Sequence, residues 1–384
     1  MRTARALRRI EELRAINALV FVDNSASGIG LVVAVKDNID VRGMPTTAGG
    51  RHLPTEARLR DAECVRRLRA AGCVIVGKTN LYEYAMGGTG ENPHRGDVVN
   101  PRHPDRDAGG SSSGSAAAVA AGLCDAALGT DTLGSVRLPA AFCGVVGYKP
   151  PRNAIARGGV FVNSSSLDAV GVLAPNVRTA ARVAALMARA PDRGRAAVRR
   201  PHRLAVPWSW MTGVSDEVRT AFRRVAADLP DIELPPRDLL NDLALRVAQF
   251  EGTRPHLGWL RSAPELYGEE VRALLEGNLQ VSVADYLAAR RELARLRALM
   301  KRRLRAVDAV LVPTVPFVPP RKARYPLEAR RHLTDLTRPF NVSDSATFSI
   351  PIPGTRLPIG LQIAANDEAT AVEVALRLER RLRA

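Results

Sequence analysis

Two turns rich in glycine and serine flank one predicted helix and one predicted strand. The first turn spans residues 109–115 (GGSSSGS) and the second spans residues 129–137 (GTDTLGSVR). The alanine-rich run between them favours a helix, and residues 125–130 are typical of a short buried strand. A helix of about ten residues rises about 15 Å, and a strand of five or six residues returns by about 17–20 Å. Ser111 and Ser135 are therefore predicted to lie close together, where two hydroxyl-bearing turns can form a polar site.

Length and composition set the broad class of the protein. A chain of 384 residues is long enough for one large or two ordinary domains, and 46% hydrophobic with 25% charged residues is typical of a globular protein. No apolar run reaches the roughly 18 residues of a membrane span, and residues 1–10 lack the apolar core of a signal peptide. We therefore expect a cytoplasmic protein without membrane association.

Charge and cysteine content bear on partners and metals. The formal net charge is +17, but the arginines are spread along predicted helices and no basic run has interleaved aromatic residues. A nucleic-acid partner is therefore not expected. The four cysteines lie in or beside apolar runs without C-x-x-C spacing, so buried free thiols are expected in place of disulfides or a zinc site.

Lysine is rare in this chain, since 51 of its 56 basic residues other than histidine are arginine and only five are lysine. Arginine does not lose its proton in proteins, whereas a desolvated lysine can become a neutral base. Lys36 follows directly after the predicted strand 31–35. Side chains alternate along a strand, so Lys36 is predicted to face away from Asp37.

The order of predicted elements indicates one α/β domain that carries a helical insertion. Residues 1–190 are expected to form the core, residues 191–306 the helical insertion, and residues 307–384 a return to the core sheet. Predicted strands are 19–22, 31–35, 73–76, 125–130, 144–148, 309–312, 347–352 and 357–363. Predicted helices are 3–17, 61–71, 80–86, 136–143, 177–189, 215–228, 236–250, 264–276, 282–306 and a last one from 367.

Three sequence patterns suggest other chemistries, and their context argues against two of them. Residues 72–79 fit the phosphate-loop pattern, but the interval between its glycines is itself an apolar strand. Residues 110–114 fit the nucleophile-elbow pattern, but a loop precedes them where a strand is needed. His332 could in principle serve a Ser-His pair. The S-x-x-K and H-E-x-x-H arrangements do not occur, so a neutral lysine is the remaining base.

The chain resembles the amidase signature family. The diagnostic stretch of that family is a Gly-Gly-Ser-Ser turn, a small-residue helix and then Gly-Thr-Asp-Thr-Gly-Gly-Ser-x-Arg-x-Pro-Ala, and residues 109–140 match it nearly throughout. The resemblance runs from residue 5 to about 185 and resumes near the C-terminus. It implies the fold of that family, a central mixed sheet covered by helices on both faces, with residues 191–306 as a divergent region on the substrate side. Further matching segments are 35–38, 77–81, 91–92, 144–150, 312–316 and 357–362.

The resemblance implies a Ser-Ser-Lys triad. Ser135 is the nucleophile, Ser111, which follows a cis peptide from Gly110, relays the proton, and Lys36 is the base. The backbone N–H groups of residues 132–135 (Thr132, Leu133, Gly134 and Ser135) form the oxyanion hole. The family mechanism proceeds through an acyl-enzyme and requires no cofactor or metal.

The resemblance also implies supporting roles, and the sequence departs from the family pattern at some of them. Met86, Gly87 and Gly110 are expected to contact substrate, and Asp131 and Arg137 are expected to brace the catalytic turn. Departures from the family occur at Leu133 and Ser113, where glycine is usual, in residues 340–346, and in the shortened region 190–306. A left-handed backbone at Leu133 costs about 1–2 kcal/mol, and otherwise its side chain narrows the acyl pocket.

The leading functional hypothesis is an amidohydrolase that converts a small carboxamide to an acid and ammonia or an amine, as a possible homodimer. A second hypothesis is a glutaminase-type component of a tRNA-dependent amidotransferase, which requires partner subunits. A third is a catalytically weak scaffold or binding protein descended from an amidase. Nucleic-acid binding is a distant fourth.

Overall fold

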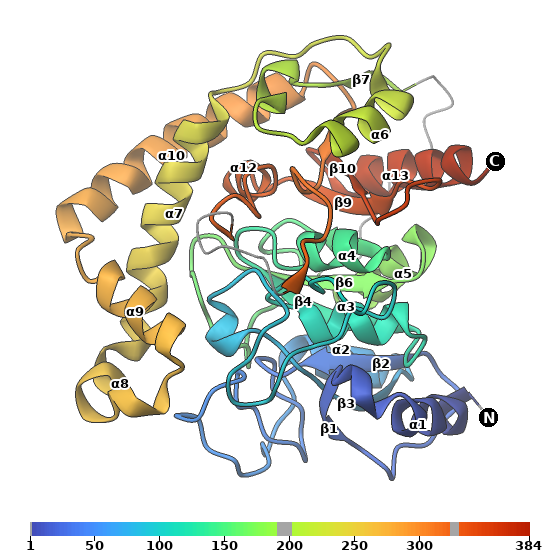
Figure 1. Ribbon diagram of the computed structural model, residues 1–384, viewed down its shortest axis with the longest axis vertical. Coiled ribbons are helices and arrows are strands. Elements are labelled where there is room, and N and C mark those ends of the chain that lie inside the picture. The colour runs from blue at the N-terminus through green and yellow to red at the C-terminus, as the bar shows by residue number, and fades with distance from the viewer. Residues whose placement is uncertain (1, 190–201, 323–329) are drawn as a thin grey trace.

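One ten-stranded sheet runs through the molecule, with both termini on the same side (Figure 1). The structure is a computed structural model that describes residues 2–189, 202–322 and 330–384. The strand order is β1-β3-β2-β4-β6-β5-β9-β10-β8-β7. The strands are β1 (Leu19–Val22), β2 (Val32–Lys36), β3 (Val74–Thr79), β4 (Ala126–Asp131), β5 (Val146–Lys149), β6 (Ala169–Ala174), β7 (Leu204–Ala205), β8 (Ala309–Pro313), β9 (Ala346–Pro351) and β10 (Gly360–Ala365).

The sheet is mixed, as predicted. Strand β2 is parallel to both β3 and β4, and β7 is parallel to β8, whereas the other neighbouring strands are antiparallel. The strands from the first half of the chain meet those from its end where β5 pairs with β9. Strands β8, β9 and β10, near the end of the chain, therefore extend the sheet that the first half of the chain forms.

Helices cover both faces of the sheet, and the alternation of side chains along β2 shows how. Val33 and Val35 belong to the larger hydrophobic cluster with α2, α5 and α13, while Val32 and Ala34 pack with α1, α3 and α4. Lys36 continues the second set, so it points toward the face that α3 covers. The helices are α1 (Arg2–Glu12), α2 (Glu63–Ala70), α3 (Ser113–Ala120), α4 (Arg137–Cys143), α5 (Val177–Met187), α6 (Asp216–Ala226), α7 (Arg237–Thr253), α8 (Leu257–Ser262), α9 (Glu269–Asn278), α10 (Val283–Leu304), α12 (Arg338–Val342) and α13 (Glu368–Arg383).

Small residues let α3 pack closely against the rest of the core. Ala116, Ala117 and Ala118 of this helix are fully buried. A Cβ atom on Gly114 would lie 2.4 Å from the Ala18 carbonyl oxygen and 2.5 Å from the Asn80 nitrogen. The first turn of α3 and the serines before it are therefore held against the ends of the central strands.

Helices α6 to α10 form the predicted helical insertion between β7 and β8. In Figure 1, α7 and α10 arch along one side of the molecule, and α8 and α9 lie at the lower end of this arch. At that end Tyr267, Val271 and Leu275 pack with Ala48 and Tyr84 of the core. The insertion thus touches the same loops that approach the first serine turn.

Strand β6 lies in a region expected to be loop, and the helix expected over residues 80–86 is absent. β6 is buried on both faces between β4 and β5, so its sequence shows no alternation of polar and apolar residues. Residues 83–85 form only a 3-10 turn, with Tyr84 in a left-handed conformation at φ 49°. The Tyr84 N–H donates to the Ala48 carbonyl, which binds this segment to a neighbouring loop.

Two general properties concern membranes and cysteines. No helix within the described ranges is long and apolar enough to cross a membrane. The four cysteines are buried free thiols, in agreement with the sequence prediction.

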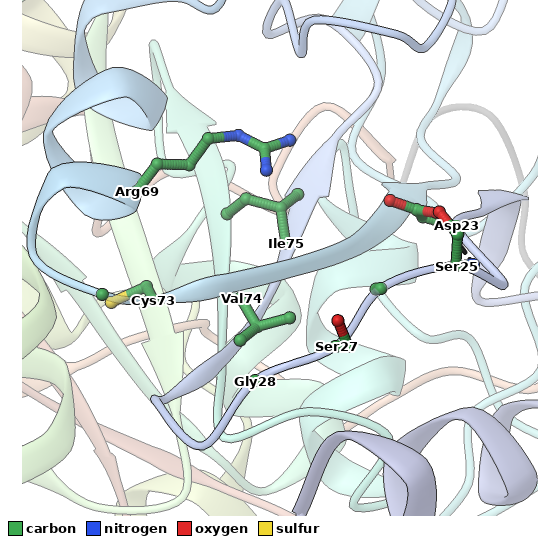
Figure 2. A pocket seen from close by; sticks show the side chains of 10 residues that line it. Asp23, Ser25, Ser27, Gly28, Arg69, Cys73, Val74 and Ile75 are labelled. Atoms are coloured by element: carbon green, nitrogen blue, oxygen red, sulfur yellow. Dashed lines mark hydrogen bonds between the residues drawn. The ribbon is translucent and has the colours of Figure 1, made fainter.

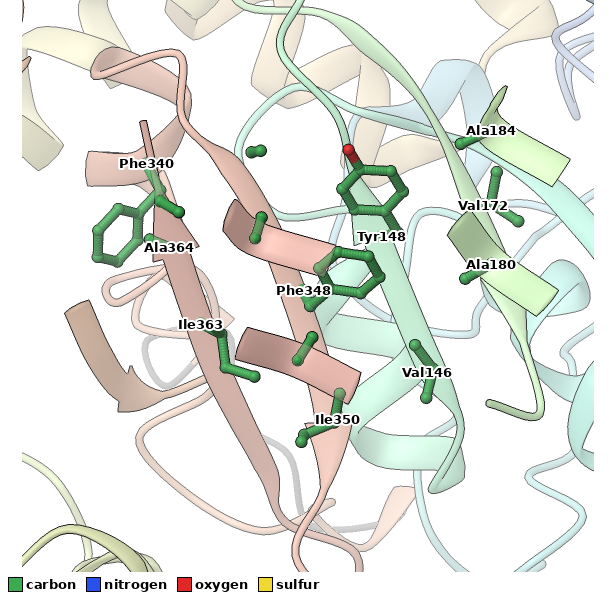
Figure 3. Packing of buried hydrophobic residues seen from close by; sticks show 14 of the residues in the cluster. Val146, Tyr148, Val172, Ala180, Ala184, Phe340, Phe348, Ile350, Ile363 and Ala364 are labelled. Carbon is green, nitrogen blue, oxygen red and sulfur yellow. The ribbon is translucent and has the colours of Figure 1, made fainter. Parts of the chain in front are cut away.

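The junction of β5 and β9 gives a prediction about stability. Phe348 of β9 is fully buried and stacks on Tyr148 of β5 with ring centroids 4.1 Å apart (Figure 3). We expect Phe348→Ala to lower the free energy of unfolding by about 3–5 kcal/mol, because it removes a large buried ring. Leu287→Ala, at a site 48% exposed, is the control and should change little. Urea unfolding of both variants measures the change in the free energy of unfolding. Equal losses of stability in the two variants would contradict the assignment of Phe348 to a packed core.

Candidate active site

Lys36 reaches the first serine turn from the end of β2. Its Nζ donates a hydrogen bond to Ser111 Oγ at 2.8 Å and another to Thr130 Oγ1 at 2.9 Å. Lys36 and Ser111 are fully buried. Asp37 binds Thr47 and Lys78 on the other side of the strand, as the alternation of side chains predicts. The structure therefore brings together the predicted base and the predicted relay.

The buried position changes the acidity of Lys36. Burial lowers the pKa of Lys36 from 10.5 to about 7, although the negative charges of Asp131 and Asp168 oppose this change. A large share of this side chain is therefore neutral near neutral pH. A neutral amine in contact with a hydroxyl can accept its proton, which an arginine at this position could not do.

The backbone before Ser111 is packed so tightly that only glycine fits at position 110. The Gly110-Ser111 peptide bond is cis. The Gly110 N–H donates to the Gly88 carbonyl at 2.8 Å, and a Cβ atom on Gly110 would lie 2.2 Å from the Thr89 carbonyl oxygen. The loop at residues 88–90 thus fixes the turn that presents Ser111.

Ser135 lies just before α4, on the second turn. The Ser112 N–H donates to the Ser135 carbonyl at 3.3 Å, so the two turns meet as their separation along the chain predicts. Ser111 and Ser112 are buried, while Ser135 is only half-buried. Of these three serines, Ser135 is the one that a substrate can reach most readily.

The turn around Leu133 is held from two sides. Thr132 Oγ1 donates to Asp168 Oδ1 at 2.7 Å, and Thr337 Oγ1 donates to the Leu133 carbonyl at 2.6 Å. Gly134 has φ 135°, and a Cβ atom there would lie 2.1 Å from Thr337 Oγ1. Leu133 lies outside the left-handed region, so its departure from the family pattern causes no backbone strain of that kind. Its half-buried side chain packs against the larger core cluster.

Asp131 and Arg137 form a buried ion pair beneath this turn. Arg137 binds both carboxylate oxygens of Asp131, at 3.0 and 2.8 Å, and Asp131 also accepts the Val136 N–H at 3.1 Å. Burial alone would raise the pKa of Asp131, but the charge of Arg137 and its hydrogen bonds hold this pKa well below its usual range. Arg137 also donates to Gln362 of β10 at 2.7 Å, and Asn341 Nδ2 donates to Asp131 at 2.9 Å.

The segment 340–346 lacks the usual glycine and proline but still forms a tight turn. Asp344 adopts the left-handed conformation at φ 59°, which aspartate tolerates better than most residues. Its carboxylate accepts the Arg152 N–H at 2.7 Å. The altered segment therefore retains a defined connection between α12 and β9.

Met86 and Gly87 lie beside the helical insertion. Met86 packs against the aromatic cluster that contains Tyr84 and Tyr267, and Gly252 of α7 approaches its side chain. A Cβ atom on Gly87 would lie 2.4 Å from the Tyr82 ring. These two residues are connected to the serine turn through the following residues 88–90, and the structure shows no direct contact of either with Lys36 or the serines.

The remaining sequence patterns lie elsewhere. The His332 side chain is 61% exposed and pairs with Asp335 at 2.8 Å. Residues 74–79 form β3, and Lys78 is buried against Asp37, so this segment cannot wrap a phosphate. The pocket in Figure 2 is lined by Asp23, residues 25–28, Arg69 and residues 72–75 and contains none of the predicted site residues. Across the described ranges, no three His, Cys, Asp or Glu side chains are grouped to hold a metal ion.

Three residues at the site were not identified from the sequence. Thr130 accepts hydrogen bonds from Lys36 and from Asn38. It lies in the second turn, on the strand β4 that is parallel to β2, and this position could have identified it from the sequence. Asp168 precedes β6, the strand that was missed. Thr337 comes from the distant C-terminal part, where no local pattern marks it.

Comparisons with known proteins agree on one family. The family model described as amidase matches residues 5–370. A glutamyl-tRNA(Gln) amidotransferase subunit from Anaeromyxobacter sp. (strain K) is 36% identical over 435 aligned positions, which cover 99% of this chain and 87% of the relative. A crystal structure of an amidase superposes with a TM-score of 0.92 at 33% identity, covering 99% of this chain and 95% of that one. The corresponding glutamyl-tRNA(Gln) amidotransferase subunit from Thermotoga maritima gives a TM-score of 0.84 at 29% identity, with 98% and 90% covered.

The ion pair beneath the turn gives a second prediction. Asp131→Asn leaves the buried Arg137 without its counter-charge, so we expect the free energy of unfolding to fall by about 3–5 kcal/mol. Asp216→Asn is the matched control, because the side chain of Asp216 is 96% exposed beside Arg219. It should unfold like the wild type in urea. An Asp131→Asn protein as stable as the control would show that the pair does not brace the fold.

Proposed function

The chain belongs to the amidase family, and we propose that it cleaves amide C–N bonds through an acyl-enzyme on Ser135. Ser111 relays the proton and Lys36 is the base. The observation that supports this most strongly is the 2.8 Å hydrogen bond from Lys36 Nζ to Ser111 Oγ in a fully buried site. Because burial brings the pKa of Lys36 to about 7, the base is available at neutral pH without a histidine.

Each proton in this reaction has a donor and an acceptor. Neutral Lys36 takes a proton from Ser111 as Ser111 takes one from Ser135, whose oxygen attacks the amide carbonyl carbon. The carbonyl oxygen becomes an oxyanion, which the backbone N–H groups of residues 132–135 bind. The C–N bond then breaks, and Ser111 protonates the leaving nitrogen with the proton that Lys36 returns. Water hydrolyses the ester by the same relay.

The rigidity of the turn explains how it stabilises the oxyanion. Removing one donor of this kind typically raises the barrier by about 2.7–4 kcal/mol. Such stabilisation requires that the donors be oriented before the reaction begins. The hydrogen bonds of Thr132 with Asp168 and of Leu133 with Thr337 hold the turn on both sides.

Two substrate classes are compatible with this chemistry. The names of the relatives favour glutamine, hydrolysed as the ammonia source of an amidotransferase with partner subunits, and this class has the greater support. A small carboxamide, hydrolysed by the chain alone, is favoured by the amidase structure and by gaps within this chain, since 99% of its 384 residues are spread over 435 aligned positions. Both classes release ammonia through the same acyl-enzyme.

The hypothesis of a catalytically weak descendant loses part of its basis. It rested on Leu133 and on residues 340–346. Leu133 adopts an ordinary backbone conformation, and Asn341 of that segment binds both members of the ion pair below the catalytic turn. The departures from the family pattern are thus compatible with an ordered site.

The role of Lys36 can be tested by its pH dependence. Protonation removes the base, so the wild-type kcat/KM for ammonia release should fall as the pH drops through about 7. Lys36→Arg keeps a permanent charge and should reduce kcat about 10²- to 10⁴-fold. Lys301→Arg, on the exposed side of α10, is the control and should behave as wild type. A Lys36→Arg enzyme with more than a tenth of the wild-type kcat would exclude lysine as the base.

The two substrate classes differ in their response to partners. We expect the isolated chain to release ammonia slowly from glutamine, and the rate to rise several-fold with glutamyl-tRNA and the companion amidotransferase subunits. A colorimetric ammonia assay measures both, with a panel of simple primary amides run in parallel. Faster turnover of a small carboxamide, unaffected by the added components, would identify that class as the substrate instead.

A further inference from the structure

A carboxylate outside the family triad lies against the catalytic turn. Asp168, the residue before β6, is buried. Its Oδ1 accepts the Thr132 hydroxyl at 2.7 Å, and its Oδ2 accepts the Asn163 N–H at 2.8 Å. Thr132 is a member of the proposed oxyanion turn and lies two residues after Thr130, whose Oγ1 accepts the Lys36 Nζ hydrogen bond at 2.9 Å. Across this short distance the charge of Asp168 raises the pKa of Lys36. One side chain is therefore in a position to affect both the oxyanion turn and the base.

The helical insertion holds the loop that bears Asp168. Glu251 of α7 accepts the Ser164 hydroxyl at 2.6 Å and the Ser166 N–H at 2.9 Å, and Tyr286 of α10 donates to the same carboxylate at 2.8 Å. The Asp168 N–H in turn donates to the Ser164 carbonyl at 2.9 Å. A continuous set of hydrogen bonds thus links the insertion to the catalytic turn.

We propose that Asp168 is a positioning residue for amide hydrolysis, which fixes Thr132 in the oxyanion turn and stabilises the positive charge that Lys36 acquires when it accepts a proton. The inference rests on the proposed function. Asp131 is the other carboxylate whose charge raises the pKa of Lys36, but that charge is offset by the bidentate contact with Arg137. Asp168 is bound mainly by neutral donors.

The charge state of Asp168 fits this role. Burial raises the pKa of Asp168 from 3.8 to about 6, while Thr132 and backbone N–H groups, with the charge of Arg157, act in the opposite direction. The carboxyl group is therefore ionised at neutral pH. A negative charge favours the protonated form of a neighbouring lysine. Its removal should lower the pKa of Lys36 and shift the acid limb of kcat/KM to lower pH.

The small number of lysines makes this directly measurable. Protein labelled with [ε-¹³C]lysine gives signals from only five lysines, and Lys36→Arg assigns that of Lys36. We expect the Lys36 titration to move to lower pH in Asp168→Asn and to stay near its wild-type midpoint in Thr337→Val, which loosens the turn without removing charge. An unchanged midpoint in Asp168→Asn overturns the inference, whether or not the wild type hydrolyses an amide.

Kinetics separate this inference from the proposed function. Thr132→Val removes the hydrogen bond to a charged group, so kcat, measured at a pH well above the pKa of Asp168 where this carboxylate stays ionised, should fall roughly 10- to 100-fold. This variant also tests the inference if Asp168→Asn does not fold, since an unchanged kcat would exclude a positioning role. If the wild type hydrolyses amides but Asp168→Asn does not shift the titration and Thr132→Val does not lower kcat, only the role of Asp168 is refuted. If Asp168→Asn shifts the Lys36 titration but the wild type hydrolyses no amide, only the proposed function is refuted.

Discussion

The site depends on one buried hydrogen bond, from Lys36 to Ser111, which joins segments 75 residues apart. The bond fixes the geometry, while burial disfavours the charged form of the lysine and lowers its pKa to about 7. Close packing of α3 on the central strands makes the contact possible. The buried alanines of the helix, and Gly114 against the backbone of Ala18 and Asn80, hold the start of the helix beside the ends of β1 and β3.

The second turn depends on residues from every part of the chain. Arg137 connects Asp131 with Gln362 of β10, and Thr337 contacts the turn itself. The C-terminal return is therefore part of the candidate site as well as of the sheet. The insertion contributes in the same way through Glu251. A mutation in either region can accordingly alter the turn that we propose to bind the oxyanion.

Local patterns predicted the parts of the site that lie close together in the sequence. Helix and strand lengths indicated that the two serine turns meet, and strand alternation gave the direction of Lys36. These arguments did not identify Asp168 or Thr337, because their contacts with the turn depend on strand pairing and join segments 36 and 204 residues apart. Strand β6 was not predicted, for a related reason. A strand buried on both faces has no alternating pattern, and its glycine favours a loop interpretation.

Covalent labelling tests the central claim most directly. A fluorophosphonate transfers its phosphonyl group to an activated serine, and peptide mapping by mass spectrometry locates the adduct. The account predicts modification of Ser135 in the wild type and its loss in Lys36→Ala. Modification of Ser112, or labelling that depends on His332 and not on Lys36, would contradict the account and favour a different nucleophile.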